Sequence, residues 1–264
     1  MELLVPIRQV TRVAGTVEIE DGELPETAVS YDLNEWDRYA IAAAVDIATD
    51  LTEATVTLVT VGPERAEAVL NEGLAMGADE ALRVWDPSLA PDSRPRADIT
   101  PVVAILAAIV SHRQPALVLT GAQSSDTARA ATGVAIAEQA GYAWASRVIG
   151  ATLDSDAERL KVRRELEDRL EARLTVELPA LLTVQTGIVS IESPTESAET
   201  ESIAVRSPAA WGLDAETLTG HHREAITGMR IPAGLQAVDR TTGEPEALAE
   251  EMVDTLRTHG VLQE

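Results

Sequence analysis

The sequence predicts an α/β protein with a doubly wound, mostly parallel sheet, followed by a small β meander and a C-terminal arm. Over the first 150 residues, apolar segments of strand type alternate with segments of helical periodicity. This order places a parallel sheet between two layers of helices. From Ser146 onward, short alternating segments replace the helical patterns. With 264 residues, 45% of them hydrophobic, we expect the α/β domain in residues 1–205 and the arm in residues 206–264.

The first half of the chain predicts four strands and four helices. The strands are apolar, β-branched runs that end at glycine, proline or polar residues, as buried strands do: Leu3–Ile7, Thr55–Val61, Ala81–Trp85 and Ala116–Thr120. The helices have apolar residues at helical spacing: Asn34–Thr49, Pro63–Met76, Thr100–Ser111 and Ala130–Gln139. Asn34 is a preferred N-cap, and Glu35 and Asp37 suit the first turn because the helix dipole favours carboxylates there. A hairpin is expected at Gly15–Leu24, around the turn Asp21-Gly22.

The second half predicts a meander and an arm. Its strands are Arg147–Leu153, Leu160–Leu166, Leu170–Leu178 and Leu181–Gln185. Ile191–Ser202 is rich in Ser, Thr and Glu, so we expect an exposed loop there. Trp211–Arg240 shows little periodicity and is expected to form the arm, and Ala247–Thr258 is expected to be an amphipathic helix.

Three loops form the predicted ligand site. In open parallel sheets, ligands bind beyond the carboxyl ends of the strands, at the point where the strand order reverses. The loops after Ile7, Val61 and Thr120 follow three such strands. We therefore expect these loops to meet around one site.

The segment Leu117–Asp126 is the best candidate for binding a phosphate. It is a strand that ends in glycine and continues into a loop rich in Ser and Thr before a helix. Backbone N–H groups at the start of a helix attract phosphate, and Arg129 could add a charged fork. The alternative is an ordinary connection in which Ser125 or Asp126 caps the helix, since such caps are common.

No pattern in the sequence predicts catalysis. The chain has no cysteine, which excludes disulfides, thiolate metal sites and cysteine nucleophiles. It has no Walker loop, no dinucleotide glycine fingerprint and no Gly-x-Ser-x-Gly elbow. The pair His221-His222 lacks the spacing of a chelate, so we expect it at the surface. The carboxylates Glu165, Glu167, Asp168 and Glu171 are expected to form a solvated strand edge rather than an acid–base pair.

The charge of the chain is strongly acidic. Asp and Glu total 44 against 21 Lys and Arg, which gives a net charge of −23. The carboxylates are spread over every segment, which favours adaptation to salt over an acidic interaction tail. The acidity argues against binding nucleic acids. No run of about 18 apolar residues and no secretory signal is found, so we expect a cytoplasmic protein.

Several segments resemble the beta subunit of electron transfer flavoproteins, collinearly over most of the chain. They are Asn34–Val45, Gly62-Pro63, Gly73–Asp79, Leu117–Asp126, Val162–Asp168 and Pro179–Thr183. Gly62-Pro63 followed by Gly73–Asp79, which resembles the second strand–helix–strand unit of the family, is the most specific of them. The long arm that ends in a helix is similar too, because family members use such an arm to embrace the partner subunit. The acidic composition suggests a salt-adapted, haloarchaeal-like member.

The resemblance implies an adenine nucleotide alpha hydrolase-like fold without hydrolase activity. It implies an electron-carrier subunit, not an enzyme, in a heterodimer whose alpha subunit holds the redox FAD. Dehydrogenases or a quinone reductase would be the redox partners. The beta subunit of this family binds AMP as a structural ligand, or a second FAD in electron-bifurcating members.

Residue by residue, the resemblance implies a nucleotide site and some departures from the family pattern. The cofactor-binding positions that it implies are Pro6, Asn34, Val61, Asp126, Thr127, Ala128, Arg129, Thr132, Gly133 and Val134. Ala131 stands where the family often has Gln, and the aspartate-rich loop is reduced to Asp126. Ile188–Glu201, in the place of the dehydrogenase-docking loop, is acidic instead of basic. The choice between AMP and FAD stays open.

Two other functions remain as alternatives. A stand-alone adenine-nucleotide sensor module on the same fold is the runner-up. A hydrolase that acts on adenylates is the weakest alternative, because the sequence shows neither a nucleophile nor a metal set.

Overall fold

The computed structural model describes residues 1–13, 19, 24–89, 98–154, 158–191, 203–214, 218 and 241–262. The strands are β1 (Glu2–Pro6), β2 (Gln9–Val13), β3 (Val29–Leu33), β4 (Thr55–Val61), β5 (Glu80–Val84), β6 (Leu117–Gly121), β7 (Ala143–Leu153), β8 (Arg159–Glu165), β9 (Glu171–Glu177), β10 (Ala180–Val184) and β11 (Ala204–Arg206). The α-helices are α1 (Glu35–Thr49), α2 (Glu67–Ala75), α3 (Thr100–Arg113), α4 (Thr132–Ala140) and α6 (Pro245–Thr258).

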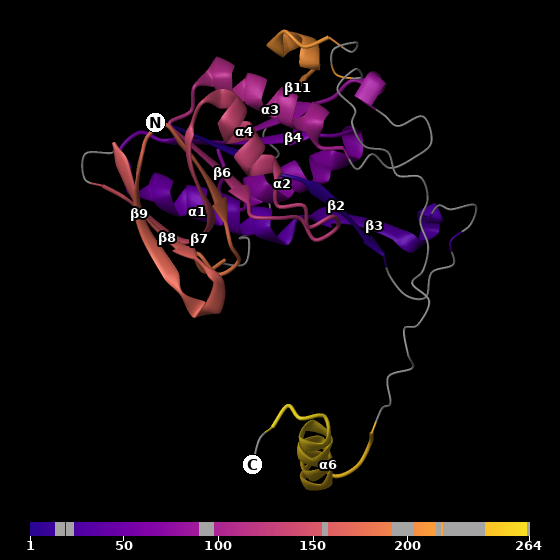
Figure 1. Ribbon diagram of the computed structural model, residues 1–264. Helices are drawn as coiled ribbons and strands as arrows, with labels where there is room; N and C mark the ends of the chain where they lie inside the picture. The colour runs from indigo at the N-terminus through magenta and orange to yellow at the C-terminus, as the bar shows by residue number, and fades with distance from the viewer. Residues whose placement is uncertain are drawn as a thin grey trace. The chain divides into compact units, whose positions relative to one another are not determined.

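A nine-stranded sheet organises the α/β part, in the order β11-β5-β4-β1-β6-β10-β7-β8-β9. From β11 to β7, neighbouring strands pair in parallel. Strands β8 and β9 extend the sheet in antiparallel register, so the predicted meander is continuous with the main sheet. Strands β2 and β3 form a separate antiparallel pair, which Figure 1 shows beside the sheet. The predicted fold class is confirmed.

Helices cover both faces of this sheet, as Figure 1 shows. One core lies under α1 and α2, where Ile41 and Leu70 pack with Leu3 of β1. The other core lies under α3 and α4, where Ile105 and Ile136 pack with other strand residues. Successive strand residues point to opposite faces, so each parallel strand needs apolar residues at nearly every position. Burial on both faces explains why the parallel strands appear in the sequence as nearly continuous apolar runs.

The strand order of the sheet reverses between β1 and β6. From the central β1 the chain passes to β4 and β5 on one side, and then crosses to β6 on the other side of β1. Regular pairing between β1 and β6 is confined to Leu3 with Leu117 and Leu4 with Val118. Beyond these pairs the two strands separate toward their carboxyl ends, which is the topological switch point of the fold.

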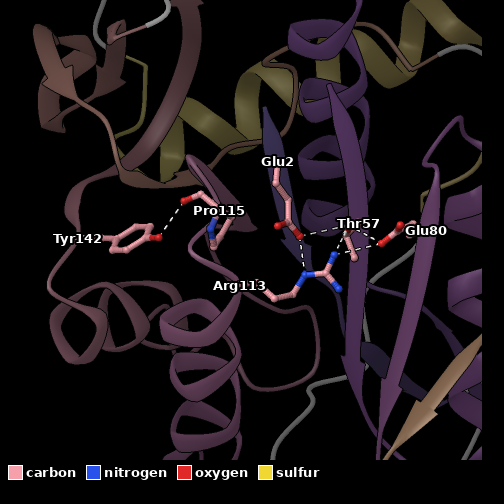
Figure 2. A network of polar contacts seen from close by, with 6 residues as sticks. All are labelled: Glu2, Thr57, Glu80, Arg113, Pro115 and Tyr142. Atoms are coloured by element: carbon pink, nitrogen blue, oxygen red, sulfur yellow. Dashed lines mark hydrogen bonds and ion pairs between the residues drawn. The ribbon is translucent and has the colours of Figure 1, made fainter. Parts of the chain in front are cut away.

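At the amino ends of the strands, a polar network joins three strands to α3 (Figure 2). The Nε atom of Arg113 donates to Glu2 Oε1 at 2.6 Å, and its Nη2 atom donates to Glu80 Oε2 at 3.1 Å. The hydroxyl of Thr57 contacts the same groups. Arg113 thus offsets part of the negative charge of two carboxylates that lie on either side of β4, at the edge opposite the predicted ligand site.

Some sequence predictions were wrong, and others fall outside the described residues. Strand β11 was not predicted; it is three residues long and depends on pairing with β5, as Ala204 with Leu82. The observed hairpin joins β2 and β3, so its strands lie outside the turn predicted at Asp21-Gly22, and most of Gly15–Leu24 is not described. Residues 192–202 and most of Trp211–Arg240 also lie outside the described residues.

The chain divides into two compact units, residues 1–229 and 230–264. The predicted boundary between residues 205 and 206 stays a prediction. The second unit contains α6, which is amphipathic and has no buried residue. Across the described parts of both units, the helices fall short of the length and apolarity that a membrane span requires.

Candidate functional site

A cavity of about 370 Å³ lies at the carboxyl ends of β1, β4 and β6. Its walls include residues 6–9 at the end of β1 and beyond, residues 60–63 at the end of β4 and beyond, residues 120–124 at the end of β6 and beyond, and residues 129–133 around the start of α4. The three loops expected to meet do meet here, at the switch point between β1 and β6. Concave sites at such points are the usual ligand sites of open α/β sheets.

The carboxylate of Asp37 lies at the base of this cavity. Its two oxygens accept hydrogen bonds from the backbone N–H groups of Arg8, at 2.8 Å, and Gly121, at 3.0 Å. Burial raises the pKa of Asp37 from its ordinary value of 3.8 to about 7, against the opposing effect of hydrogen bonds from Arg8, Asn34 and Gly121. A carboxyl group therefore titrates near neutral pH inside the site.

Asn34 occupies the N-cap position of α1, but its side chain is used elsewhere. The helix begins at Glu35 as predicted, yet the side chain of Asn34 makes no capping hydrogen bond. Its amide instead donates to the carbonyl of Gln123 at 2.8 Å and accepts from the N–H of Ser125 at 3.2 Å. The expected N-cap position is confirmed, but the side chain does not cap the helix, because its amide reaches across to the loop after β6.

A salt bridge joins the loop after β1 to the loop after β6. The guanidinium of Arg8 donates to Asp126 Oδ2 at 2.7 Å, and the side chain of Asp126 is 14% exposed. Asp126 therefore does not cap α4, which begins only at Thr132. The negative charge of Asp126 is balanced by Arg8, which reduces its repulsion toward an anionic ligand.

The start of α4 has the features of an anion site. Its N-cap position is Ala131, and no side chain makes a capping hydrogen bond there within the described residues. The alternative of a helix capped by Ser125 or Asp126 is therefore wrong. Ala128 and Ala130 adopt left-handed backbone conformations with φ of 49° and 53°, which cost energy for non-glycine residues and cluster at functional sites. The unpaired N–H groups of the first turn are available to a phosphate.

Two glycines allow the close packing around the cavity. A Cβ atom on Gly121 would collide with the carboxylate of Asp37 and lie 2.6 Å from Trp36 Cβ. A Cβ atom on Gly133 would lie 2.5 Å from Thr120 Oγ1, so Gly133 brings α4 close to the sheet. The Thr120 hydroxyl is buried and makes no hydrogen bond among the described residues.

The structure brings most of the sequence-predicted site residues together. Those that line the cavity are Pro6, Asn34, Val61, Asp126, Thr127, Arg129, Thr132 and Gly133. Ala128 and Val134 belong to the same loop and first turn but do not line it. Sequence reasoning missed the site roles of Arg8, Asp37 and Gly121. A signal for Asp37 existed, because Asn34, Asp37 and Ile41 share the buried face of α1.

The other polar clusters lie away from the cavity. Glu165 is paired with Arg147 at 3.0 Å, and Glu171 with Arg163 at 3.4 Å, at the ends of β8 and β9. Hydrogen bonds from Gln185 and Arg147 lower the pKa of Glu165. His221 and His222 fall outside the described residues. Within the described part of the chain, no group of His, Asp and Glu is arranged to hold a metal.

The fold and the cavity define an α/β protein with a candidate ligand site at the switch point of its sheet. Comparison with known proteins identifies its family. The family model of the electron transfer flavoprotein domain matches residues 22–210. The electron transfer flavoprotein subunit beta of Methylophilus methylotrophus is 36% identical over 191 residues, covering 71% of this chain and 70% of that protein. The corresponding protein of Clostridium acetobutylicum is 32% identical over 184 residues, covering 69% and 68%.

A more distant relative aligns over nearly the whole chain. The electron transfer flavoprotein subunit beta of Dictyostelium discoideum is 23% identical over 271 residues and covers 99% of each chain. The matched family model covers well over half of this chain. The chain belongs to the electron transfer flavoprotein family, as a beta subunit. Its role is therefore in electron transport.

Proposed function

We propose that this beta subunit carries a nucleotide, AMP or a second FAD, in the cavity between β1, β4 and β6, and supports the redox FAD of an alpha subunit. In this proposal the heterodimer passes electrons from dehydrogenases to a downstream acceptor, such as a quinone reductase. Membership in the family supports the carrier role. The position of the cavity at the switch point supports the nucleotide.

The observation that carries the nucleotide is the uncapped first turn of α4, which opens onto the cavity. The N–H groups of Thr132, Gly133 and Val134 are the donors proposed for a phosphate. Thr127 and Arg129 line the wall beside them and could add side-chain donors. A volume of about 370 Å³ is near the lower end for ligand pockets, so it favours AMP over a second FAD.

The remaining contacts have supporting roles in this proposal. Pro6 and Val61 line the cavity beside β1 and β4 and offer apolar surface to a base. Asn34 and Asp126 act mainly on the loop, because their side chains bond Gln123 and Arg8. No catalytic role is proposed for any residue, and the subunit acts by positioning a nucleotide and shaping the surroundings of the flavin.

The proposed contact with the alpha subunit includes the arm, residues 206–264. Helix α6 is amphipathic, with Met252 66% exposed and Val253 37% exposed. Apolar residues exposed on one face of a helix mark a surface for another protein. We assign this face of α6 to the partner subunit.

Nucleotide extraction tests the proposal. The chain is purified with its alpha subunit, the complex is denatured, and AMP and FAD released per heterodimer are measured. We expect one AMP and one FAD. Two FAD and no AMP would assign a second FAD to the cavity, and neither nucleotide beyond the alpha-subunit FAD would contradict the proposal. A stable nucleotide-bound monomer that does not associate with the alpha subunit would favour the sensor alternative.

Reduction of the bound flavin tests the carrier role. We expect an acyl-CoA dehydrogenase or a reduced ferredoxin system to bleach the flavin absorbance of the heterodimer. A complex that stays oxidised with every donor would contradict the role. Whether Ile188–Glu201 docks the dehydrogenase is tested by neutralising its acidic residues and measuring the rate of bleaching.

A further inference from the structure

The carboxylate of Asp37 lines the cavity but is buried. Direct contact with a ligand does not explain its position. Asp37 is 5% exposed, and the other equally buried carboxylate of the described residues is Asp98. Asp98 has a local role, because it accepts hydrogen bonds from the N–H and hydroxyl of Thr100 at the start of α3. The backbone partners of Asp37 are instead distant in the sequence, because Arg8 lies between β1 and β2 and Gly121 ends β6.

The Asp37 carboxylate takes the place of backbone hydrogen bonds between β1 and β6, whose regular pairing ends at the switch point. Strands β1 and β6 pair only at Leu3 and Leu4 of β1, and then separate. Backbone N–H groups exposed by such a separation are costly when buried and unpaired. Asp37 bridges the gap, with one oxygen on the N–H of Arg8 and the other on the N–H of Gly121.

We propose that Asp37 is the positioning residue of the nucleotide site, which fixes the separation of β1 and β6 and thereby aligns the loop of residues 121–131 for the phosphate. The inference rests on the proposed function and concerns the phosphate side alone. Gly121 is the last residue of β6, from which this loop starts, and the loop leads directly into α4 at Thr132.

The surrounding contacts make the loop rigid once Gly121 is held. Asn34, one turn before Asp37 on the same face, bonds Gln123 and Ser125 of the loop. Arg8 bonds Asp126 through its side chain. The side chains of the first turn of α1 and of Arg8 thus fix the loop at successive points. By contrast, the residues of the β4 wall that the structure describes make no hydrogen bond to Asp37.

In this proposal the affinity for AMP has two parts, one from the phosphate and one from the rest of the nucleotide, which face different walls of the cavity. A variant of Asp37 displaces the N–H groups that face a phosphate, whereas the wall at β4 that faces the rest of the nucleotide stays in place. At pH 8, where Asp37 is mostly ionised, Asp37→Asn presents a donor to one of the two N–H groups and so breaks one hydrogen bond. We expect it to weaken binding of AMP about tenfold and to leave binding of adenosine within about twofold.

Calorimetry on the complete heterodimer tests this. The nucleotide is removed, and AMP and adenosine are titrated into the wild type, Asp37→Asn and the matched control Asp46→Asn, which changes an exposed aspartate of the same helix. A fall in the AMP-to-adenosine affinity ratio in Asp37→Asn alone supports the proposal. An unchanged ratio overturns it, and a wild type that binds AMP no better than adenosine overturns the proposed phosphate site as well.

A second variant and a measurement on the wild type guard against loss of folding. Asp37→Ser places a single hydroxyl at the γ position, short of both N–H groups, so its affinity ratio should be no higher than that of Asp37→Asn. In the nucleotide-free wild type, we expect the amide hydrogens of Arg8 and Gly121 to exchange slowly, because Asp37 rather than the ligand holds them. Exchange at both sites as fast as at exposed loop amides would refute the positioning role.

Discussion

The carboxylate of Asp37 accepts a hydrogen bond from the N–H of Gly121 at 3.0 Å, although the two residues are 84 positions apart in sequence. The bond joins the first turn of α1 to the last residue of β6. It lies where β1 and β6 separate to form the cavity, so the same contact matters for the stability of the fold and for the shape of the site.

The raised pKa of Asp37 predicts a pH dependence of stability. Because its pKa is about 7 in the folded chain and 3.8 when unfolded, the folded state binds more protons between these values, and stability falls as pH rises through this window. The full contribution is about 4 kcal/mol. Urea unfolding of the wild type and Asp37→Asn at pH 5, 6, 7 and 8 checks this. A stability difference between the two proteins that is constant with pH would contradict it.

Gly121→Ala should destabilise the fold. The added Cβ would collide with the Asp37 carboxylate and lie 2.6 Å from Trp36 Cβ and 3.0 Å from its backbone carbon. Such overpacking costs about 1–3 kcal/mol. The matched control is Gly243→Ala, whose Cβ would only make ordinary contact with Leu248 at 3.8 Å. Equal urea midpoints for the two variants would show that the site around Gly121 adjusts freely.

Arg113→Met should destabilise the amino edge of the sheet (Figure 2). Methionine keeps an aliphatic side chain but leaves Glu2 and Glu80 without their shared cation. The loss of the charge-assisted hydrogen bond to the half-buried Glu2, with a smaller effect at the exposed Glu80, predicts a cost of about 1–3 kcal/mol. Arg163→Met, which removes an exposed pair at 3.4 Å, should cost less than about 1 kcal/mol. Thermal unfolding of both variants decides whether the network matters.

Met252→Glu should weaken the heterodimer without changing the stability of this chain. Met252 is 66% exposed on α6, so a charge there meets only water until the partner covers it. Desolvating that charge should lower the affinity for the alpha subunit at least about tenfold. Asp254→Asn is the control, because position 254 lies about 160° around the helix from Met252 and its side chain is exposed. Equal affinities of both variants, measured by analytical ultracentrifugation, would remove α6 from the interface.

Stability should rise with salt. At a net charge of −23, repulsion among carboxylates opposes the compact state, and salt screens it. We expect the melting temperature of the full chain to increase between low and molar potassium chloride. An unchanged melting temperature would refute salt adaptation, which stays a prediction.

Local patterns in the sequence were sufficient to place most elements. Strand β4 begins and ends where its β-branched run does, at Thr55 and Val61, because a strand buried on both faces favours apolar and β-branched residues. Helix α1 begins after Asn34 as predicted. Strand β11 was missed because three residues carry no periodicity, and pairing with β5 rather than local preference stabilises it.

The candidate site was predictable in outline and not in its contacts. The rule for parallel sheets was enough to bring together the loops after Ile7, Val61 and Thr120. The sequence could not show that Asn34 bonds the loop after β6 instead of its own helix. Capping preferences describe neighbours in the chain, whereas the partners of Asn34 at Gln123 and Ser125 are far along it.

The sequence by itself determined the α/β class, the alternation of elements and the membership in a family, because these depend on local periodicity and on motifs. Only the tertiary structure decided that β10 lies between β6 and β7 and that β1 and β6 separate at the site. It also decided the partners of Asp37. Strand order and buried hydrogen bonds join residues that are distant in the chain, so no local pattern records them.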